Sequence, residues 1–402
     1  MRVCMVAYSF YESDNRVMRY AEALAARGDE VEVLALRREG QSKEGTINGV
    51  RVLRIRKRIK DEKIQWSYLL RILIFFFKAT ILVSVKHLRK PYSLVHVHSV
   101  PDFLVFAAWL PRLTGAKVVL DIHDLLPEFY SSKFSSGAQY LSFKLLWLIE
   151  LVSASFAHHV IAANHIWQIK LIARSVAAPR CSVFLNYPDR SVFQHRGRTR
   201  RDDKIVLLYP GTLSRHQGLD TAIRCMEDVK HSEPNAELHI YGEGSAKSSL
   251  VQLAHELRLD DTVFFRDVIP LREVASVMEN ADIGIVPKRN DTFGDEAFST
   301  KILEFMAMSV PVIVSDTTVD RYYFDDKLVV FFESGNAEDL AASIIKLIRD
   351  PDARRLQVNN ANEFITQNDW SNKKDEYLRL VDGLVISGSS VEGVKKASQV
   401  LL

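Results

Sequence analysis

Short apolar runs rich in β-branched residues alternate with helical patterns along this chain, and that alternation constrains its fold most strongly. It predicts parallel sheets built from strand–helix–strand units. In the first half, strands are expected near 3–7, 31–36, 50–55, 94–97, 117–121, 159–162 and 182–185, with helices that include 14–27 and 101–113. The pattern restarts with strands near 205–209, 236–241, 263–265, 283–286, 311–314 and 328–332, and continues through a helix at 337–349.

Length and this restart together predict two domains, because 402 residues exceed what one hydrophobic core usually supports. We predict an α/β protein with two doubly wound parallel-sheet domains. The expected boundaries are an N-terminal domain at 1–195, a charged linker at 196–204 and a C-terminal domain at 205–370. A helical tail at 371–402 follows, and it could pack back on the N-terminal domain.

The three cysteines, Cys4, Cys181 and Cys225, are odd in number and lie far apart without metal-ligand spacing. Neither a disulfide framework nor a zinc site is indicated, which favours a reducing compartment. The first ten residues lack a basic region and a cleavage site, so they are interpreted as a strand rather than a signal peptide. We therefore expect a cytoplasmic protein.

The net charge of +3 is too small to indicate a nucleic-acid partner. Its distribution is more informative, because a basic cluster precedes an apolar, aromatic-rich helical stretch at 66–85 that Arg71 and Lys78 interrupt. The cluster comprises Arg51, Arg54, Arg56, Lys57, Arg58 and Lys60. The two charges inside the stretch argue against a spanning helix. Basic residues beside Trp, Tyr and Phe fit an interfacial helix, which would place the protein at the inner face of the plasma membrane. A buried core helix is the alternative, and both interpretations stay open.

Polar residues gather in loops at the expected carboxyl ends of the strands, where ligands bind in such sheets. The loop 210–218 carries Gly211 and Gly218 at its ends and Arg215 between them, and could cradle phosphates. An ordinary strand-to-helix turn is the alternative. Gly242 lies in a weaker candidate loop, and neither domain has a complete G-x-G-x-x-G after its first strand, which counts against hydride transfer.

A third loop holds Glu296 and Glu304, separated by seven residues, with a helix expected to start near Ser299. Glu296 would lie where a sugar can sit, the helix N-terminus would face a diphosphate, and Glu304 could accept hydrogen bonds from a ribose diol. Two solvated glutamates are the alternative interpretation.

The run from Ser299 to Ile313 resembles the donor-site signature of the retaining GT-B glycosyltransferases of family 4, which include glycogen synthase-like and mannosyl- or GlcNAc-transferring enzymes. The segment from Asp121 to Glu128, and Asn186 to Asp189 with Phe193, resemble further motifs of that family in the same order. The resemblance implies two Rossmann-like domains facing each other across a cleft. It also implies that His123 lies near the transferred sugar, that Glu296 contacts sugar hydroxyls and that Glu304 binds the ribose.

This sequence departs from the family pattern at several positions. Family members carry an Arg and a Lys where this chain has Thr212 and Gln217, so Arg215, His216 or Lys301 would have to bind the phosphates, unless backbone amides do so alone. Ser13 to Arg16 replace a glycine pair, and Ser309 replaces a glycine.

The predicted catalytic residues are His123 and Glu296, and the predicted acceptor-side residues are Asn15, Arg16 and Asp124. The predicted donor-binding residues are Gly211, Thr212, Arg215, Gln217, Gly242, Val268, Phe298, Ser299, Thr300, Lys301 and Glu304. No metal is expected: His96/His98 and His158/His159 lack a carboxylate at ligand spacing, so we interpret them as packing or edge residues, and Asp350 with Asp352 as a turn and cap.

We predict a metal-independent retaining glycosyltransferase without a cofactor. It would move a hexosyl or N-acetylhexosaminyl group from a nucleoside diphosphate sugar to a saccharide or lipid-linked acceptor in cell-surface polysaccharide or glycolipid synthesis. The alternatives are another GT-B enzyme, such as a sugar-nucleotide 2-epimerase or a phosphorylase, and a non-catalytic nucleotide-sugar-binding scaffold.

Overall fold

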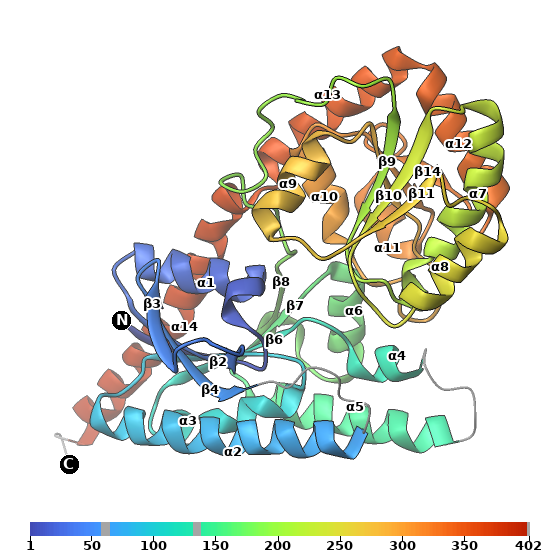
Figure 1. The fold of residues 1–402 in the computed structure, drawn as a ribbon. Helices are drawn as coiled ribbons and strands as arrows, with labels where there is room; N and C mark the ends of the chain where they lie inside the picture. Colours follow the sequence, from blue (N-terminus) through green and yellow to red (C-terminus); the bar gives the residue numbers. More distant parts are fainter. Residues whose placement is uncertain (58–64, 132–137, 400–402) are drawn as a thin grey trace. The chain divides into compact units, whose positions relative to one another are not determined.

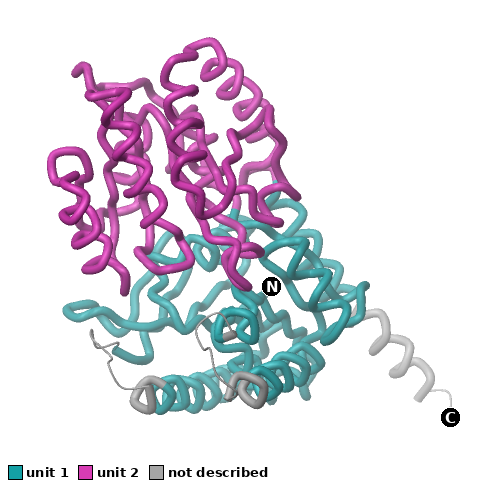
Figure 2. Tube along the Cα trace, turned by 90° about the vertical axis from the view of Figure 1, so that its right-hand side faces the viewer, with its two compact units in different colours: residues 1–186, 373–402 teal, residues 187–372 magenta. Residues whose placement is uncertain are grey.

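The computed structural model describes residues 1–57, 65–131 and 138–399. They form two compact units, which Figure 2 colours separately. The first unit comprises Met1–Asn186 together with Lys373–Leu402, and the second comprises Tyr187–Asn372. The chain therefore enters the second unit at Tyr187 and returns to the first within its C-terminal helix.

The first unit is built on an eight-stranded sheet with the order β3-β4-β2-β1-β5-β6-β7-β8 (Figure 1). Its strands are β1 (Arg2–Ala7), β2 (Glu30–Arg37), β3 (Glu44–Ile47), β4 (Val50–Lys57), β5 (Leu94–His98), β6 (Lys117–Ile122), β7 (His159–Ala162) and β8 (Cys181–Val183). Its helices are η1 (Tyr11–Ser13), α1 (Asn15–Ala26), α2 (Gln65–Arg89), η2 (Asp102–Ala108), α3 (Trp109–Leu113), α4 (Leu126–Ser131), α5 (Ala138–Phe156), α6 (His165–Arg174) and η3 (Ala178–Arg180).

The second unit is built on a six-stranded sheet with the order β11-β10-β9-β12-β13-β14. Its strands are β9 (Ile205–Pro210), β10 (Ala236–Tyr241), β11 (Val263–Arg266), β12 (Ile283–Val286), β13 (Val312–Ser315) and β14 (Val330–Phe332). Its helices are η4 (Arg215–Gln217), α7 (Leu219–Ser232), α8 (Lys247–Glu256), α9 (Leu271–Glu279), α10 (Thr300–Ala307), α11 (Thr318–Tyr323), α12 (Ala337–Arg349) and α13 (Pro351–Gln367). The last helix, α14 (Trp370–Gln399), begins here and continues into the first unit.

Every predicted strand is present, and the predicted α/β class with two parallel-sheet units is confirmed. Parallel strands are covered on both faces, which explains why runs such as β1 and β12 are buried along their whole length. The sequence did not predict β3, which pairs antiparallel with β4 at the sheet edge. Its short sequence Glu-Gly-Thr-Ile contains too few apolar residues to stand out from a loop.

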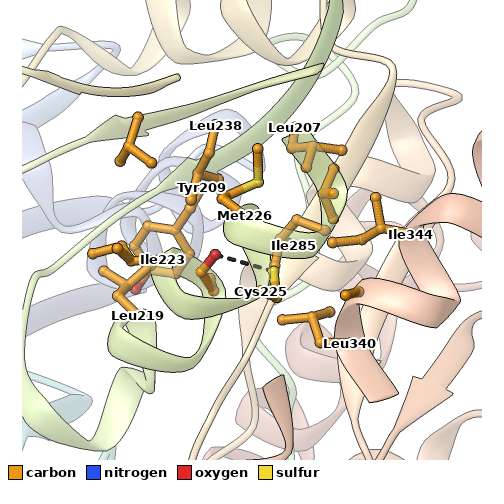
Figure 3. Packing of buried hydrophobic residues seen from close by; sticks show 14 of the residues in the cluster. Leu207, Tyr209, Leu219, Ile223, Cys225, Met226, Leu238, Ile285, Leu340 and Ile344 are labelled. Atoms are coloured by element: carbon orange, nitrogen blue, oxygen red, sulfur yellow. Dashed lines mark hydrogen bonds between the residues drawn. The ribbon is translucent and has the colours of Figure 1, made fainter. Parts of the chain in front are cut away.

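Figure 3 shows the core of the second unit. Leu207 and Tyr209 of β9 meet Ile223 and Met226 of α7 there, and helix α12 adds Leu340. The α7 face is apolar because its buried residues recur at helical spacing. This packing fixes where β9 ends and therefore where the loop after it begins.

Helix α2 is apolar on two faces. Ile72, Phe75, Ala79 and Val83 are at most 4% exposed and pack inward, so the core-helix interpretation is confirmed for that face. Large apolar side chains on other faces of the same helix remain exposed. None of the helices, within the part of the chain that the structure describes, is long and apolar enough to cross a bilayer.

The stretch 196–204 belongs to the second unit and does not form the boundary between the units. The backbone N–H of Gly197 donates to Glu279, the backbone N–H of Thr199 donates to Asn280, and Arg200 pairs with Asp282. The stretch is thus bound to residues between the end of α9 and the start of β12, which a sequence pattern alone does not show.

Candidate active site

Each sheet has a point at which the strand order reverses, and ligands bind at such points in open α/β sheets. In the second unit the order reverses at β9, between β10 and β12. The loops that follow β9 and β12 contain Gly211–Gly218 and Glu296. In the first unit it reverses at β1, between β2 and β5, and the loop after β1 leads to Asn15 and Arg16. The sheet topology thus brings these predicted residues to the two points where the strand order reverses.

The loop after β9 requires glycine at both ends. Gly218 has φ +65°, and a side chain there would collide with the carbonyl of Pro287. A side chain at Gly211 would collide with Lys301, and one at Gly242 would collide with the Gly211 carbonyl. The backbone of this loop is therefore packed directly against Pro287, Lys301 and Gly242, which glycine permits because it has no side chain.

Two predicted donor residues of this loop are fixed by the buried Tyr209. Its hydroxyl lies 3.0 Å from the carbonyl of Thr212 and 2.9 Å from Oε1 of Gln217. The Gln217 side chain therefore holds the shape of the loop. Arg215 is exposed in η4, and no described residue forms an ion pair with it.

Lys301 lies at the start of α10, against the loop after β9. Its Nζ is 5.1 Å from the centre of the Tyr209 ring, and a side chain at position 211 would have its Cβ only 3.0 Å from this Nζ. Burial lowers the pKa of Lys301 to about 8, although Glu304 opposes the shift. The structure thus brings a cation to the loop that lacks the family's Arg and Lys, although Lys301 lies about 90 positions away in the sequence.

The N-terminus of α10 carries Ser299 as its N-cap and Thr300 as its first residue. The Ser299 hydroxyl is buried and has no hydrogen-bond partner among the described residues. The first N–H groups of a helix have no intrahelical acceptor. A hydroxyl and backbone amides are therefore available beside Lys301 for an anionic ligand.

The loop that carries Glu296 is held by Lys288, which the sequence analysis did not identify. Lys288 is buried, donates to the carbonyl of Ala297 at 2.8 Å and pairs with Asp320 at 3.0 Å. A second bond joins the backbone N–H of Thr318 to Asp295 at 2.8 Å. A lysine two positions after a fully buried strand was the only sequence signal for this role.

The other predicted donor residues lie around these loops. Glu296 and Glu304 are half-buried. Phe298 packs against Tyr323, with ring centres 4.9 Å apart, and Val268 is 65% exposed after β11. That these four residues bind the sugar nucleotide stays a prediction.

In the first unit, Asp121 is the centre of a buried network. Arg16 donates to both of its oxygens at 2.7 and 2.8 Å, and also to the carbonyl of Phe184. His98 Nδ1 and His123 Nε2 each lie 3.1 Å from Oδ2 of the same carboxylate. His123 is therefore oriented by a buried anion while 20% of its side chain stays exposed.

The ionisable groups of this network shift one another's pKa values. Burial alone would raise the pKa of Asp121, but Arg16 and the two histidines lower it well below its usual range. Burial would lower the pKa of His123, yet Asp121 outweighs burial and raises it. The His123 imidazole is consequently held closer to its protonated form than an ordinary histidine.

His96 and His98 are buried packing residues, as predicted, but the expectation that they lack a carboxylate at ligand spacing was wrong. Strands β5 and β6 are neighbours, and their register places His98 opposite Asp121. His96, His98 and Asp121 offer ligand atoms within 4.8 Å of one another. Because the Arg16 guanidinium already covers both carboxylate oxygens, a cation there would face like-charge repulsion.

Other predicted residues have the following places. Asn15 is the half-buried first residue of α1, behind the N-cap Asp14. Arg16 is bound to Asp121, and Asp124 is half-buried, with a pKa that burial raises. Acceptor contacts by these three residues remain a prediction.

Two expectations about non-catalytic residues are confirmed. His158 accepts the backbone N–H of Val118, and His159 bonds the Ser182 hydroxyl. Asp350 caps α13. Ser309, which replaces the family's glycine, adopts φ +57°, so this position constrains the backbone as well as the packing.

Two family models match nearly the whole chain. One, described as glycosyl transferase 4-like domain, covers residues 13–186, and the other, described as glycosyl transferases group 1, covers residues 192–364. The chain belongs to the GT-B glycosyltransferases of family 4.

Curated relatives of this glycosyltransferase are distant. An uncharacterized glycosyltransferase of Methanocaldococcus jannaschii is 24% identical over 381 residues, which are 90% of this chain and 91% of the relative. An O-antigen biosynthesis glycosyltransferase of Escherichia coli is 24% identical over 61% of this chain and 67% of its own length.

Solved structures share the fold. Sucrose-phosphate synthase from Thermosynechococcus elongatus superposes with a TM-score of 0.80 at 18% identity, over 96% of this chain and all of that one. Anabaena HepE in complex with UDP-glucose superposes with a TM-score of 0.72 at 16% identity, over 96% and 100% of the two chains. The GT-B fold is thereby confirmed.

Proposed function

We propose that this glycosyltransferase moves a sugar from a nucleoside diphosphate sugar to an acceptor hydroxyl with retention of anomeric configuration. The observation that supports it best is the convergence of Lys301, the buried Ser299 hydroxyl and the Gly211 backbone at the strand-order reversal of the second unit. A cation, a hydroxyl and backbone amides together match the needs of a diphosphate.

Each residue that is predicted to bind the sugar nucleotide would then have a distinct role. Lys301 and the N-terminus of α10 would stabilise the leaving diphosphate as negative charge develops on it, which is the task a divalent metal performs in other enzymes. Glu304 would accept hydrogen bonds from the ribose and Glu296 from sugar hydroxyls. Lys288 would keep Glu296 in position by holding the loop carbonyls.

In the first unit, His123 would donate a hydrogen bond to the transferred sugar. Asp121 would act as a positioning residue, because it fixes the imidazole ring and favours its protonated form. We propose no covalent intermediate on the protein.

The acceptor would be a saccharide or lipid-linked saccharide of a cell-surface polysaccharide or glycolipid, and the enzyme would work at a membrane surface on the cytoplasmic side. The exposed apolar side chains of α2 support a membrane contact, since large exposed apolar patches mark interaction sites. The Escherichia coli relative is named for O-antigen biosynthesis, a role of the same kind.

The first test is thermal unfolding with UDP, GDP and ADP, because a ligand of the native state raises the melting temperature. UDP is the first candidate, since similar structures hold UDP or UDP-glucose. We expect one nucleotide to stabilise the protein and Glu304→Ala to remove that effect. Glu363→Ala, at an exposed glutamate of α13, is the matched control. No stabilisation by any of the three would contradict the proposal.

The second test separates transfer from binding alone. With a donor identified, His123→Ala should abolish transfer and leave the nucleotide shift intact, and the proton coupling at the new anomeric centre should show the donor's configuration. A protein that binds donor but neither transfers nor epimerises the sugar would instead be a scaffold.

A further inference from the structure

A groove of about 790 Å³ lies between the edge of the first sheet and α2. One wall comes from the ends of β2 and β4, and the other from the middle of α2. The groove lies entirely within the first unit, and no predicted site residue lines it.

The polar lining of this groove is strongly cationic. Glu44 is the only acidic residue in the lining, and six residues are basic: Arg37, Lys43, Arg54, Arg56, Lys57 and Lys78. Arg54 is neutralised by Glu12, and Lys57 by Glu39. Glu44 itself binds Arg51, at 3.0 Å.

Four of these cations are not neutralised by an acidic side chain among the described residues. No described residue forms an ion pair with Arg37, Lys43, Arg56 or Lys78. Arg37 and Arg56 are half-buried on neighbouring strands, and Lys78 faces them from α2 across the groove. Cations held together in a concave site attract an anion, and a guanidinium suits the oxygens of a phosphate.

The wall formed by α2 is apolar and continues onto the surface. Ile81, Leu82 and Val85 line the groove. Phe77, Ile81, Val85 and Leu88 are spaced four, four and three positions apart, so they share one helix face, and they are 60%, 65%, 40% and 69% exposed. A ligand in the groove would therefore meet Arg37 and Arg56 on the strand side, and Lys78 beside an open apolar row on the helix side.

Two neighbouring helices extend the exposed apolar surface. Trp109 and Leu113 of α3 are 46% and 70% exposed, and Leu145 and Leu148 of α5 are 58% and 50% exposed. Figure 1 shows α2, α3 and α5 along the same side of the first unit. The sequences of the three helices contain one carboxylate, Glu150, which is buried against Arg174.

We propose that this groove binds the phosphate headgroup of an anionic membrane lipid, with Arg37, Arg56 and Lys78 as its ligands, while the exposed rows of α2, α3 and α5 contact the acyl chains. The proposal rests on the membrane contact proposed above and on no step of sugar transfer. Basic groups beside an acid-free apolar surface complement an anionic bilayer. Of the predicted basic cluster, Arg58 and Lys60 lie outside the described residues, as does the side chain of Trp66.

The test is co-sedimentation of the full chain with vesicles of phosphatidylcholine, alone or mixed with phosphatidylglycerol. We expect tighter binding to the anionic vesicles. Arg56→Ala and Lys78→Ala should each weaken that binding roughly fivefold, the effect of one basic residue at an anionic surface. The matched control is Arg89→Ala, which removes an exposed cation of the same helix outside the groove.

A second pair of variants tests the apolar half of the proposal. Phe77→Ser and Leu88→Ser should weaken binding to the mixed vesicles, while Leu356→Ser, at a 63% exposed leucine of α13, should not. If only the charge variants weaken binding, and free glycerol phosphate protects the protein from thermal unfolding as well as the mixed vesicles do, the ligand is a soluble phosphate. The lipid proposal then fails.

Two further outcomes would overturn the proposal. Equal losses from Arg56→Ala and Arg89→Ala would indicate diffuse electrostatic attraction without a headgroup site. Equal binding to neutral and mixed vesicles would exclude a preference for a headgroup with net negative charge. The thermal shift with nucleotide is measured on every variant. Vesicle binding without any nucleotide shift would reject the proposed donor but support the groove.

Discussion

The first and second units differ in whether their charged candidate site residues have partners of opposite charge within the protein. In the first unit the protein supplies the partners: Asp121 receives hydrogen bonds from Arg16, His98 and His123. In the second unit Lys301 is half-buried, and desolvation is compensated so little that its pKa is lowered to about 8. The first site is thus built in advance to orient one histidine, whereas the second retains a cation whose charge a bound diphosphate would stabilise.

The strongest test of this comparison is Asp121→Asn. The change keeps the shape of the side chain but leaves the buried Arg16 without its counter-charge, and breaking a buried ion pair typically costs about 3–5 kcal/mol. We expect a loss of that size in the free energy of unfolding, measured by chemical denaturation.

Its control is Asp382→Asn, at an aspartate that is 47% exposed and pairs with Arg27. An exposed pair contributes about 1 kcal/mol or less. Similar losses for the two variants would show that the first site does not depend on an internally neutralised network.

The second test is Lys301→Met. Loss of a hydrogen-bonded charge at the diphosphate should weaken nucleotide binding roughly 10- to 100-fold. The free energy of unfolding should not fall, because burial already disfavours the charged ammonium group. Isothermal calorimetry and thermal unfolding measure the two effects, with Lys346→Met on α12 as the control.

If Lys301→Met instead destabilised the protein and left nucleotide affinity unchanged, Lys301 would be a structural residue. The contrast between the two units would then disappear.

The third test uses pH. Because the pKa of Lys301 is about 8, the ammonium form predominates below that pH and is lost as pH rises through it. Nucleotide affinity should therefore be level below pH 8 and fall by about tenfold for each pH unit above it. Lys301→Arg should remove this dependence, since a guanidinium stays charged, and a flat profile in the unaltered protein would contradict the assignment.

The smallest expected effect comes from Tyr377→Phe, which removes a buried hydroxyl 3.0 Å from Nδ1 of His96. The loss of one such bond should cost about 1 kcal/mol of stability. Tyr241→Phe is the control, because its hydroxyl bonds no described residue. A null result would mean that this hydroxyl adds nothing to the packing of α14, to which the stacking of Tyr377 on Tyr20 at 4.2 Å also contributes.

Much of the fold was predictable because its signals are local. Strands β7, β10 and β12 have the predicted bounds. Short, fully buried runs mark β7 and β12, whereas β10 alternates apolar and polar residues, and both patterns indicate strands. The positions of Gly211 and Ser299 in strand-to-helix loops followed from the same pattern. Strand β3 was missed because a short, partly polar edge strand has no such signal.

The sequence alone therefore determined the alternation of strands and helices, the order of the family motifs and the loops that carry the candidate residues, because each depends on neighbouring residues. Only the tertiary structure decided which distant side chains meet. The register of β5 against β6 placed His98 on Asp121, and α14 brought Tyr377 to His96 across 281 positions. Strand order likewise placed Lys301 beside Gly211, and α2 beside the basic end of β4. Local sequence does not specify such contacts, because packing and hydrogen-bond register are properties of the assembled sheet.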